Sequence, residues 1–154
     1  MSIYLKDINE ENLLECALLT TNKEGKNYVF EEFVASNAFS IAQSKIQEGW
    51  TVKAIYNEDL MIGFTMYGYC NEYDFYEICR LMIDHKYQGK GFGRISLRKI
   101  IEEMKKNEDC KDIYISFDPK NNIARSLYES LGFKDTGKTL EEELLFKLED
   151  NKII

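Results

Sequence analysis

The spacing of hydrophobic and polar positions along the chain predicts alternating strands and helices. Runs of alternating apolar residues indicate strands, and apolar residues three and four positions apart indicate helices that lie on a sheet. The expected strands are residues 2–8, 50–56, 60–69, 76–83 and 113–117, with one or two more between 133 and 148. The expected helices carry apolar stripes at Leu13, Leu14, Ala17 and Leu18; at Phe30, Val34, Ala38, Ile41 and Ala42; at Leu97, Ile100, Ile101 and Met104; and at Ala124, Leu127, Tyr128 and Leu131. Asn9 or Asn12 can cap the first helix. This order of elements predicts a layered, mixed α/β fold in a single domain over residues 1–154.

The stretch 76–101 joins a strand to a helix through a glycine-rich turn, QGKGFG at 88–93. Glycines let a ligand approach the backbone closely, and the first N–H groups of a helix carry the positive end of its dipole. Such a turn is an anion site that suits a phosphate or pyrophosphate. Two nucleotide motifs do not fit. A G-x-G-x-x-G pattern that starts at Gly89 ends on Arg94, and a Walker motif lacks Ser or Thr after Lys90.

Two other patterns do fit, and they occur in order. The turn matches Q-x-x-G-x-G at Gln88, Gly91 and Gly93, and residues 121–133 match N-x-x-A-x-x-L-Y-x-x-L-G-F. On these residues the chain resembles the GNAT family of acetyl-CoA-dependent N-acetyltransferases. The resemblance is weakest before about residue 50. It implies a GNAT fold, with a mixed and mostly antiparallel sheet of six to seven strands, helices on both faces, and a splay between the fourth and fifth strands that holds acyl-CoA.

The resemblance also assigns residues to the acetyl-CoA co-substrate. Backbone groups at 81–83 would bind pantetheine and the thioester carbonyl, and the turn would bind the pyrophosphate. Asn121 would contact CoA or cap its helix. Tyr128 would act as the acid toward the CoA sulfur. The expected cofactor-binding residues are Leu81, Met82, Ile83, Gln88, Gly89, Lys90, Gly91, Phe92, Gly93, Arg94, Asn121 and Tyr128. From spacing alone, Lys90 and Arg94 read equally well as exposed basic residues, and Tyr128 as part of an apolar stripe.

Glu77 is the candidate general base, directly or through a water molecule. It stands eleven positions before Gln88, an offset that resembles the catalytic glutamate of the histone-acetylating branch of the family. Strand alternation predicts that Glu77 shares a face with Cys79, Leu81 and Ile83, where apolar neighbours would raise its pKa. The alternative is a glutamate at a strand end that faces solvent. We interpret Cys79 as a small core residue and not a nucleophile, so that attack by the amine is direct.

An acidic and aromatic mouth is the candidate amine site. It would combine Glu31, Glu32, Glu72, Asp74 and Glu77 with Tyr67, Tyr69, Tyr73 and Tyr76. Carboxylates and aromatic faces suit an extended cation such as a polyamine. A solvated rim with ordinary sheet aromatics explains the same composition. The run RLMID-x-x-YQGKGFG, with FTMYGY upstream, also resembles the bacterial spermine/spermidine (diamine) acetyltransferases, which often carry an acidic or aromatic residue where Cys79 stands.

Composition narrows the functional classes. The formal net charge of −7 disfavours a nucleic-acid partner, which requires a basic surface. No apolar run is long enough to span a membrane, and the N-terminus is too polar for a signal peptide. The four cysteines form no C-x-x-C pair, which favours reduced thiols in the cytoplasm and disfavours a metal site. Dimers are common in the family, so a homodimer is compatible with the resemblance. The sequence leaves open two other functions, acetylation of a protein lysine or N-terminus and non-catalytic acyl-CoA binding.

Overall fold

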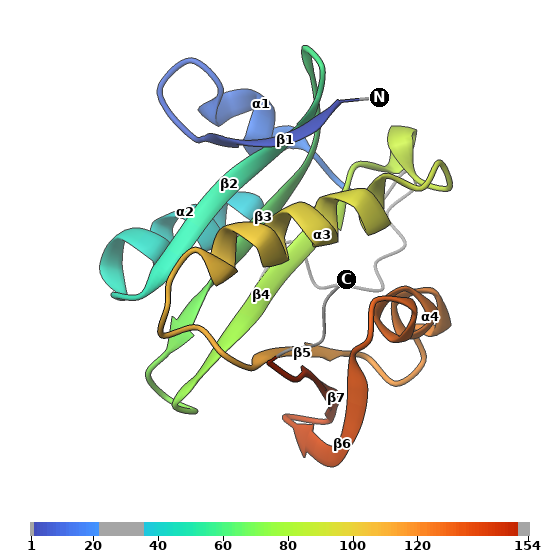
Figure 1. Ribbon diagram of the computed structural model, residues 1–154. Coiled ribbons are helices and arrows are strands. Elements are labelled where there is room, and N and C mark those ends of the chain that lie inside the picture. The colour runs from blue at the N-terminus through green and yellow to red at the C-terminus, as the bar shows by residue number, and fades with distance from the viewer. Residues whose placement is uncertain (1, 22–35, 151–154) are drawn as a thin grey trace.

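The computed structural model describes residues 2–21 and 36–150. Its centre is a seven-stranded sheet in the order β1-β2-β3-β4-β5-β7-β6 (Figure 1). The strands are β1 (Ile3–Asp7), β2 (Trp50–Asn57), β3 (Leu60–Cys70), β4 (Phe75–Ile83), β5 (Ile113–Phe117), β6 (Lys134–Leu140) and β7 (Glu143–Leu148). Neighbouring strands are antiparallel except β4 and β5, which are parallel. The expected mixed, mostly antiparallel sheet is confirmed.

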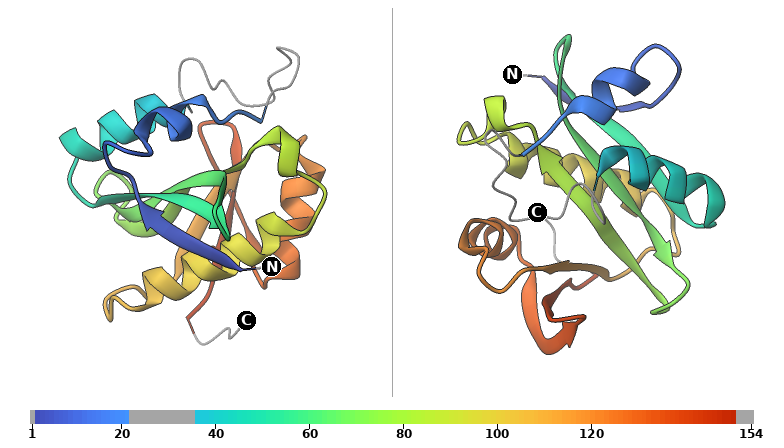
Figure 2. Two further views of the ribbon diagram at one scale, coloured as in Figure 1. Left: turned by 90° about the horizontal axis from the view of Figure 1, so that it is seen from above. Right: turned by 180° about the vertical axis from the view of Figure 1, so that it is seen from behind.

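Helices cover both faces of the sheet (Figure 2). They are α1 (Leu13–Leu18), α2 (Asn37–Ile46), α3 (Phe92–Lys105) and α4 (Asn122–Ser130), with a short 3₁₀ helix η1 at His85–Tyr87. Leu97 and Ile100 of α3 share one buried cluster with Tyr128 of α4. Cys16 of α1 belongs to a second cluster, against which Ile41 of α2 packs. We call the two sides of the sheet the α3–α4 face and the α1–α2 face.

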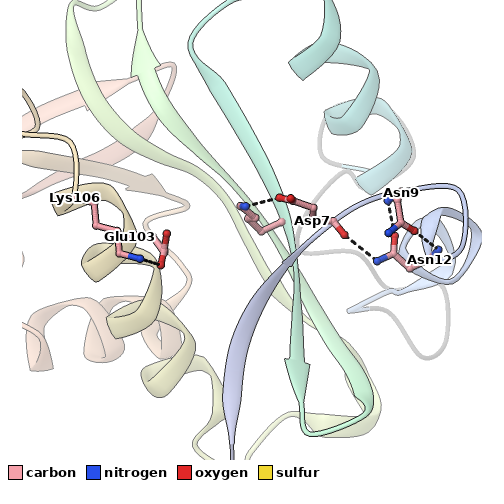
Figure 3. A network of polar contacts seen from close by, with 6 residues as sticks. Asp7, Asn9, Asn12, Glu103 and Lys106 are labelled. Carbon is pink, nitrogen blue, oxygen red and sulfur yellow. Dashed lines mark hydrogen bonds and ion pairs between the residues drawn. The ribbon is translucent and has the colours of Figure 1, made fainter.

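The first helix is shorter and lies differently than its apolar stripe predicts. Leu13, Leu14 and Leu18 are exposed, and Cys16 is the residue that α1 buries fully. A network of asparagines sets this orientation (Figure 3). Asn9 Oδ1 accepts the N–H of Asn12 at 3.2 Å, and Asn12 Nδ2 donates to the carbonyl of Asp7 at 3.0 Å. The asparagines therefore cap the turn that precedes α1 and tie it to β1, whereas neither caps the helix through a side chain.

The second helix begins at Asn37, and Ser36 caps it by accepting the N–H of Phe39 at 3.0 Å. Two positions of its expected stripe, Phe30 and Val34, lie outside the described residues. Glu31 and Glu32, which we expected in the substrate site, lie outside them as well.

The parallel pair β4–β5 separates soon after it begins. Its register joins only Tyr76–Ile78 to Ile113–Ile115, while β4 continues to Ile83 with β3 alone as its partner. Figure 1 shows the two strands diverging from this point. An edge without a strand partner presents backbone N–H and C=O groups that an extended ligand can bind. The expected splay between the fourth and fifth strands is thus present.

A β-bulge at Cys79 changes which side chains share a face. Tyr67 pairs with Ile78 and Met66 pairs with Arg80, so Cys79 has no partner in β3. Ile78 and the partly buried Leu81 belong to the α3–α4 face, whereas Cys79 packs against the cluster of the α1–α2 face. A bulge inserts one residue and resets the alternation. Glu77 therefore shares a face with Cys79 as predicted, whereas the predicted place of Leu81 and Ile83 on that face is wrong.

Candidate active site

The glycine-rich turn connects the end of β4 to the start of α3. Gly89 and Gly91 have φ values of +75° and +83°, a conformation that other residues rarely adopt. A Cβ atom added at either position would meet nothing within 4 Å, so the surface beside the turn is open. Gly91 is the N-cap of α3 and provides no side chain to cap it. The turn therefore presents the uncapped N–H groups of a 14-residue helix to open space, an arrangement that fits a pyrophosphate.

Side chains fix this turn from both ends. Gln88 Nε2 donates to the carbonyl of Ile83 at 2.9 Å, so the side chain of the motif glutamine returns to the end of β4. Phe92 is buried and packs with Ile55 and Ile62 in the sheet. The glutamine therefore joins the turn to the strand before it, and the aromatic side chain anchors the start of α3.

The two basic residues of the turn behave differently from each other. Arg94 reaches across to the end of α4, where its guanidinium donates to the Ser130 hydroxyl and, at 3.4 Å, to the Ser130 carbonyl. Lys90 lies with its Nζ 6.0 Å from the centre of the Tyr87 ring. Arg94 thus joins α3 to α4 in this structure, and Lys90 is the residue whose charge remains beside the turn.

Asp84, which we did not expect to be important, holds the turn against the N-terminal part of the chain. Its side chain is almost fully buried. One carboxylate oxygen accepts the N–H of Thr20 and the other accepts the N–H of Lys86, both at 3.0 Å. The N–H of His85 in turn donates to the carbonyl of Thr20 at 2.8 Å. No sequence motif marked Asp84, because Thr20, its partner in the N-terminal part of the chain, is 64 residues away and is brought to it only by the fold.

Tyr128 lies at the core of the α3–α4 face. Only 8% of the residue is exposed, and its ring packs edge-on against Phe117 with centroids 5.2 Å apart. Burial, with a smaller contribution from Glu143, raises the pKa of its hydroxyl. Within the described residues this hydroxyl makes no hydrogen bond, although a buried tyrosine hydroxyl normally has one. The hydroxyl is therefore a protonated donor that lacks a protein acceptor there.

Asn121 is the N-cap of α4. Its Oδ1 accepts the N–H of Ala124 at 3.0 Å. The capping role expected for this motif residue is confirmed.

Glu77 is a buried carboxyl group and does not face solvent as a strand-end residue would, since only 8% of it is exposed. Burial raises its pKa, and a hydrogen bond from the Cys70 thiol and the charge of Arg80 partly oppose that shift. It stands within the three residue pairs that join β4 to β5, opposite Tyr114. The carboxyl therefore lies next to the point where the two strands separate.

Cys79 is not suited to act as a nucleophile. Burial raises the pKa of its thiol to about 12, so the reactive thiolate is scarce near neutral pH. Arg80 Nη1 lies 2.8 Å from the sulfur and 2.9 Å from the Cys79 carbonyl. The interpretation of Cys79 as a small packing residue agrees with this environment.

The proposed mouth of tyrosines divides between the two faces. Tyr67 packs in the cluster of the α3–α4 face, where burial raises its pKa to about 12. Tyr76 lies on that face too, because its hydroxyl accepts a hydrogen bond at 3.2 Å from Asn107 just beyond α3. Tyr69 packs edge-on against Tyr76 with centroids 5.0 Å apart. These three tyrosines therefore point away from Glu77, and the expectation that they line one mouth with it is wrong.

Two expected substrate residues lie in the turn between β3 and β4. Glu72 and Asp74 are both exposed. The charge of Glu72 contributes to the raised pKa of Glu77 and of Tyr73. Glu72 and Tyr73 therefore interact electrostatically with Glu77.

A second carboxylate, Glu143, joins the α1–α2 face from the last hairpin. Its Oε1 accepts a hydrogen bond from Ser116 Oγ at 3.1 Å. Ser116 follows Tyr114 by two positions in β5, and Tyr114 pairs with Glu77, so these side chains share a face. Partial desolvation raises the pKa of the Glu143 carboxyl. The sequence offered only strand alternation in 143–148 as a signal, and without the strand order it could not identify a neighbour.

The part of the chain that the structure describes lacks two features. None of the helices there is long and apolar enough to cross a membrane. The same residues contain no group of three or more His, Cys, Asp or Glu side chains that could hold a metal ion.

Comparison with known proteins finds a family match that includes both sequence motifs. The Acetyltransferase (GNAT) family matches residues 8–133. A spermine/spermidine N(1)-acetyltransferase of Bacillus subtilis (strain 168) is 29% identical over 144 residues, which cover 90% of this chain and 91% of that protein. The PaiA N-acetyltransferase from Thermoplasma acidophilum, solved in complex with coenzyme A, has a TM-score of 0.71 at 20% identity, covering 97% of this chain and 99% of that one. The ribosomal-protein-S18-alanine N-acetyltransferase from Escherichia coli has a TM-score of 0.69 at 17% identity, covering 97% and 94%. The chain belongs to the GNAT family of acetyltransferases.

Proposed function

We propose that this acetyltransferase transfers the acetyl group of acetyl-CoA to a primary amine of a small polyamine, by direct attack of the amine. The buried carboxyl of Glu77, beside the separation of β4 and β5, is the observation that carries the proposal. A protonated amine has a reference pKa of about 10 and cannot attack until it loses a proton. Glu77 accepts that proton directly or through one water molecule.

The co-substrate would lie along the free edge of β4. Backbone groups of Leu81, Met82 and Ile83 would hold the pantetheine arm, because β5 has left this part of the strand. The N–H groups of the turn at 88–94 would bind the pyrophosphate, with the charge of Lys90 beside them. The open space above Gly89 and Gly91 supports this placement.

Tyr128 would complete the reaction as the acid. Its raised pKa keeps the hydroxyl protonated, and the hydroxyl has no acceptor within the described residues. It can therefore donate to the sulfur that leaves when the amide bond forms. Glu77 and Tyr128 approach the strand separation from different elements, β4 and α4, which suits a base and an acid that act at two ends of one transfer.

The proposed substrate rests on charge and on one relative. Glu77 and Glu143 lie on one face of the sheet, and the charge of Glu72 in the β3–β4 turn also acts on Glu77. An extended polycation is the amine that such a surface attracts. The relative from Bacillus subtilis carries a polyamine acetyltransferase name at 29% identity. The fold does not decide the substrate, because the Escherichia coli structure with the same fold is named for the alanine of a ribosomal protein.

The test is thiol release from acetyl-CoA with a panel of amines: spermine, spermidine, putrescine, a lysine peptide and an alanine-initiated peptide. We expect turnover with the polyamines, increasing with their charge, above the rate without amine. Turnover with a peptide alone would overturn the substrate class and support a protein acetyltransferase. Binding of CoA without turnover of any amine would favour a non-catalytic acyl-CoA-binding protein.

A further inference from the structure

The α1–α2 face carries a strip of carboxylates and aromatic rings that the transfer reaction alone does not require. Glu77 of β4 lies opposite Tyr114 of β5, and two positions along β5 Ser116 holds Glu143 of β7 by its 3.1 Å hydrogen bond. The strip therefore crosses three adjacent strands, and its two carboxylates come from β4 and β7. The sheet order places β4, β5 and β7 beside one another (Figure 1).

The charge of Glu143 acts on both the candidate base and the candidate acid. Its charge contributes to the raised pKa of Glu77 and is the charge that acts on the Tyr128 hydroxyl. That hydroxyl belongs to a residue that is only 8% exposed, and it has no hydrogen-bond partner within the described residues. Tyr128 is mostly buried, its hydroxyl has no protein acceptor within the described residues, and the charge of Glu143 acts on it, so the hydroxyl is available to a ligand at this site.

Stacked aromatic rings continue the strip away from Glu77. Phe75 stacks on Tyr114 with centroids 4.3 Å apart and an interplanar angle of 15°, and Tyr73 lies 5.8 Å from Phe75. The flat faces of such rings pack well against methylene groups and attract cations. Glu72 and Glu141 are the charges that act on the outermost ring, Tyr73.

Two basic side chains on this face, Lys147 and Arg80, bear on the net negative charge of the strip. Lys147 lies over Tyr114, but its Nζ is 3.9 Å from Asp112, which takes up its charge. Arg80 bonds the backbone and sulfur of Cys79, and it lowers the pKa of both Glu77 and Glu143. Arg80 therefore offsets part of the negative charge of the two carboxylates.

We propose that Glu143 binds the second ammonium group of the substrate while the first is at Glu77, so that Glu143 selects diamines and polyamines over monoamines. This inference rests on the proposed polyamine substrate and adds the residue that discriminates. A monoamine has no group to place at Glu143. A polyamine has an ammonium there and lays its methylene groups on the rings of Phe75 and Tyr114.

The test compares Glu143→Gln with the matched variant Glu142→Gln, which changes the preceding glutamate; both side chains are exposed, but Glu142 lies outside β7. The substrates are spermidine and the monoamine n-hexylamine, and each variant's melting temperature and affinity for CoA are measured first. We expect Glu143→Gln to lower kcat/KM for spermidine about tenfold or more, mainly through KM, since one lost charge contact is worth about that factor. The value for hexylamine should stay within about twofold, as should both values in Glu142→Gln.

Each other outcome is decisive. Equal losses for the two amines would make Glu143 part of the transfer machinery, and unchanged spermidine kinetics would remove it from the site. Either result overturns the inference while leaving the acetyl transfer intact. If the unaltered protein acetylates neither amine, the proposed function fails, and calorimetric titration of the CoA-saturated protein with spermidine decides the inference. Binding weakened only by Glu143→Gln supports it, and equal binding or none overturns it.

Discussion

The side chain of Gln88 donates from Nε2 to the carbonyl of Ile83 at 2.9 Å, so the first residue of the glycine motif is bonded to the last residue of β4. The bond closes the turn on the strand that we propose to hold the pantetheine arm. The hydrogen bond thereby ties together the two parts of the proposed co-substrate site, the strand edge and the glycine-rich turn.

Replacing Gln88 should weaken co-substrate binding more than folding. Gln88→Ala removes a hydrogen bond worth about 1 kcal/mol, which corresponds to an approximately fivefold increase in the Kd for CoA. Isothermal titration calorimetry measures this change. Gln88→Glu is the matched control, because it keeps the length of the side chain and loses the donor, and it should weaken binding at least as much. Full affinity in both variants would show that the bond does not organise the site.

Gly91→Glu should abolish CoA binding. The new side chain would enter the open space beside the turn and place a negative charge where we propose the pyrophosphate lies. Gly137 is a matched position, since its φ is +78° against +83° for Gly91 and an added Cβ there also meets nothing within 4 Å. Gly137→Glu carries the same backbone strain and charge but should bind CoA normally. Retained affinity in Gly91→Glu would place the anion site elsewhere.

Tyr128→Phe should lower kcat by about 100-fold with little change in CoA affinity, because only the proton donor is removed. Tyr67→Phe is the control, since Tyr67 is equally buried at 8% exposure in the same α3–α4 cluster but has no proposed role in the transfer. Its kcat should change little. Pre-steady-state and steady-state thiol release measure both variants, and an unchanged kcat in Tyr128→Phe would end its role as the acid.

The pH dependence of the rate should report Glu77. Because burial raises its pKa, kcat/KM should fall as the pH decreases through that raised value, when the base becomes protonated. Glu77→Gln should lower kcat and remove this acidic limb from the profile. Rates measured from about pH 5 to about pH 9 test this expectation. An acidic limb that persists in Glu77→Gln would assign the base to another group.

The Glu77 carboxyl should lower the free energy of unfolding as the pH increases. A glutamate whose folded pKa is raised binds protons more tightly in the folded state, so its contribution to the free energy of unfolding is present at low pH and lost as the pH rises through the folded value. Glu77→Gln should therefore be more stable than the unaltered protein at neutral pH, with the difference disappearing in acid. Urea unfolding at both pH values measures it, and a less stable variant at neutral pH would contradict the raised pKa.

Local patterns in the sequence determined much of this protein by themselves. Period-two and helical spacing located β1 to β5 and the helices α3 and α4, and indicated one or two strands where β6 and β7 lie, because the spacing follows from which positions an element buries. The glycines of 88–93 predicted the turn at the start of α3, since its left-handed backbone and uncapped helix start depend on residues that are neighbours in sequence. The asparagine of the second motif was identified as a cap for the same reason.

The tertiary structure decided how the side chains meet. The bulge at Cys79 separated Glu77 from Leu81 and placed Arg80 beside it, because one unpaired residue reverses the alternation beyond it. The three tyrosines assigned to the amine site turned to the α3–α4 face, since their partners lie on α3 and β4. Glu143 lies beside β5 only because of the strand order β5-β7-β6, in which β7 is between β5 and β6. Local sequence thus set the backbone elements, whereas register and strand order, which depend on contacts between distant segments, determined the chemistry of the face.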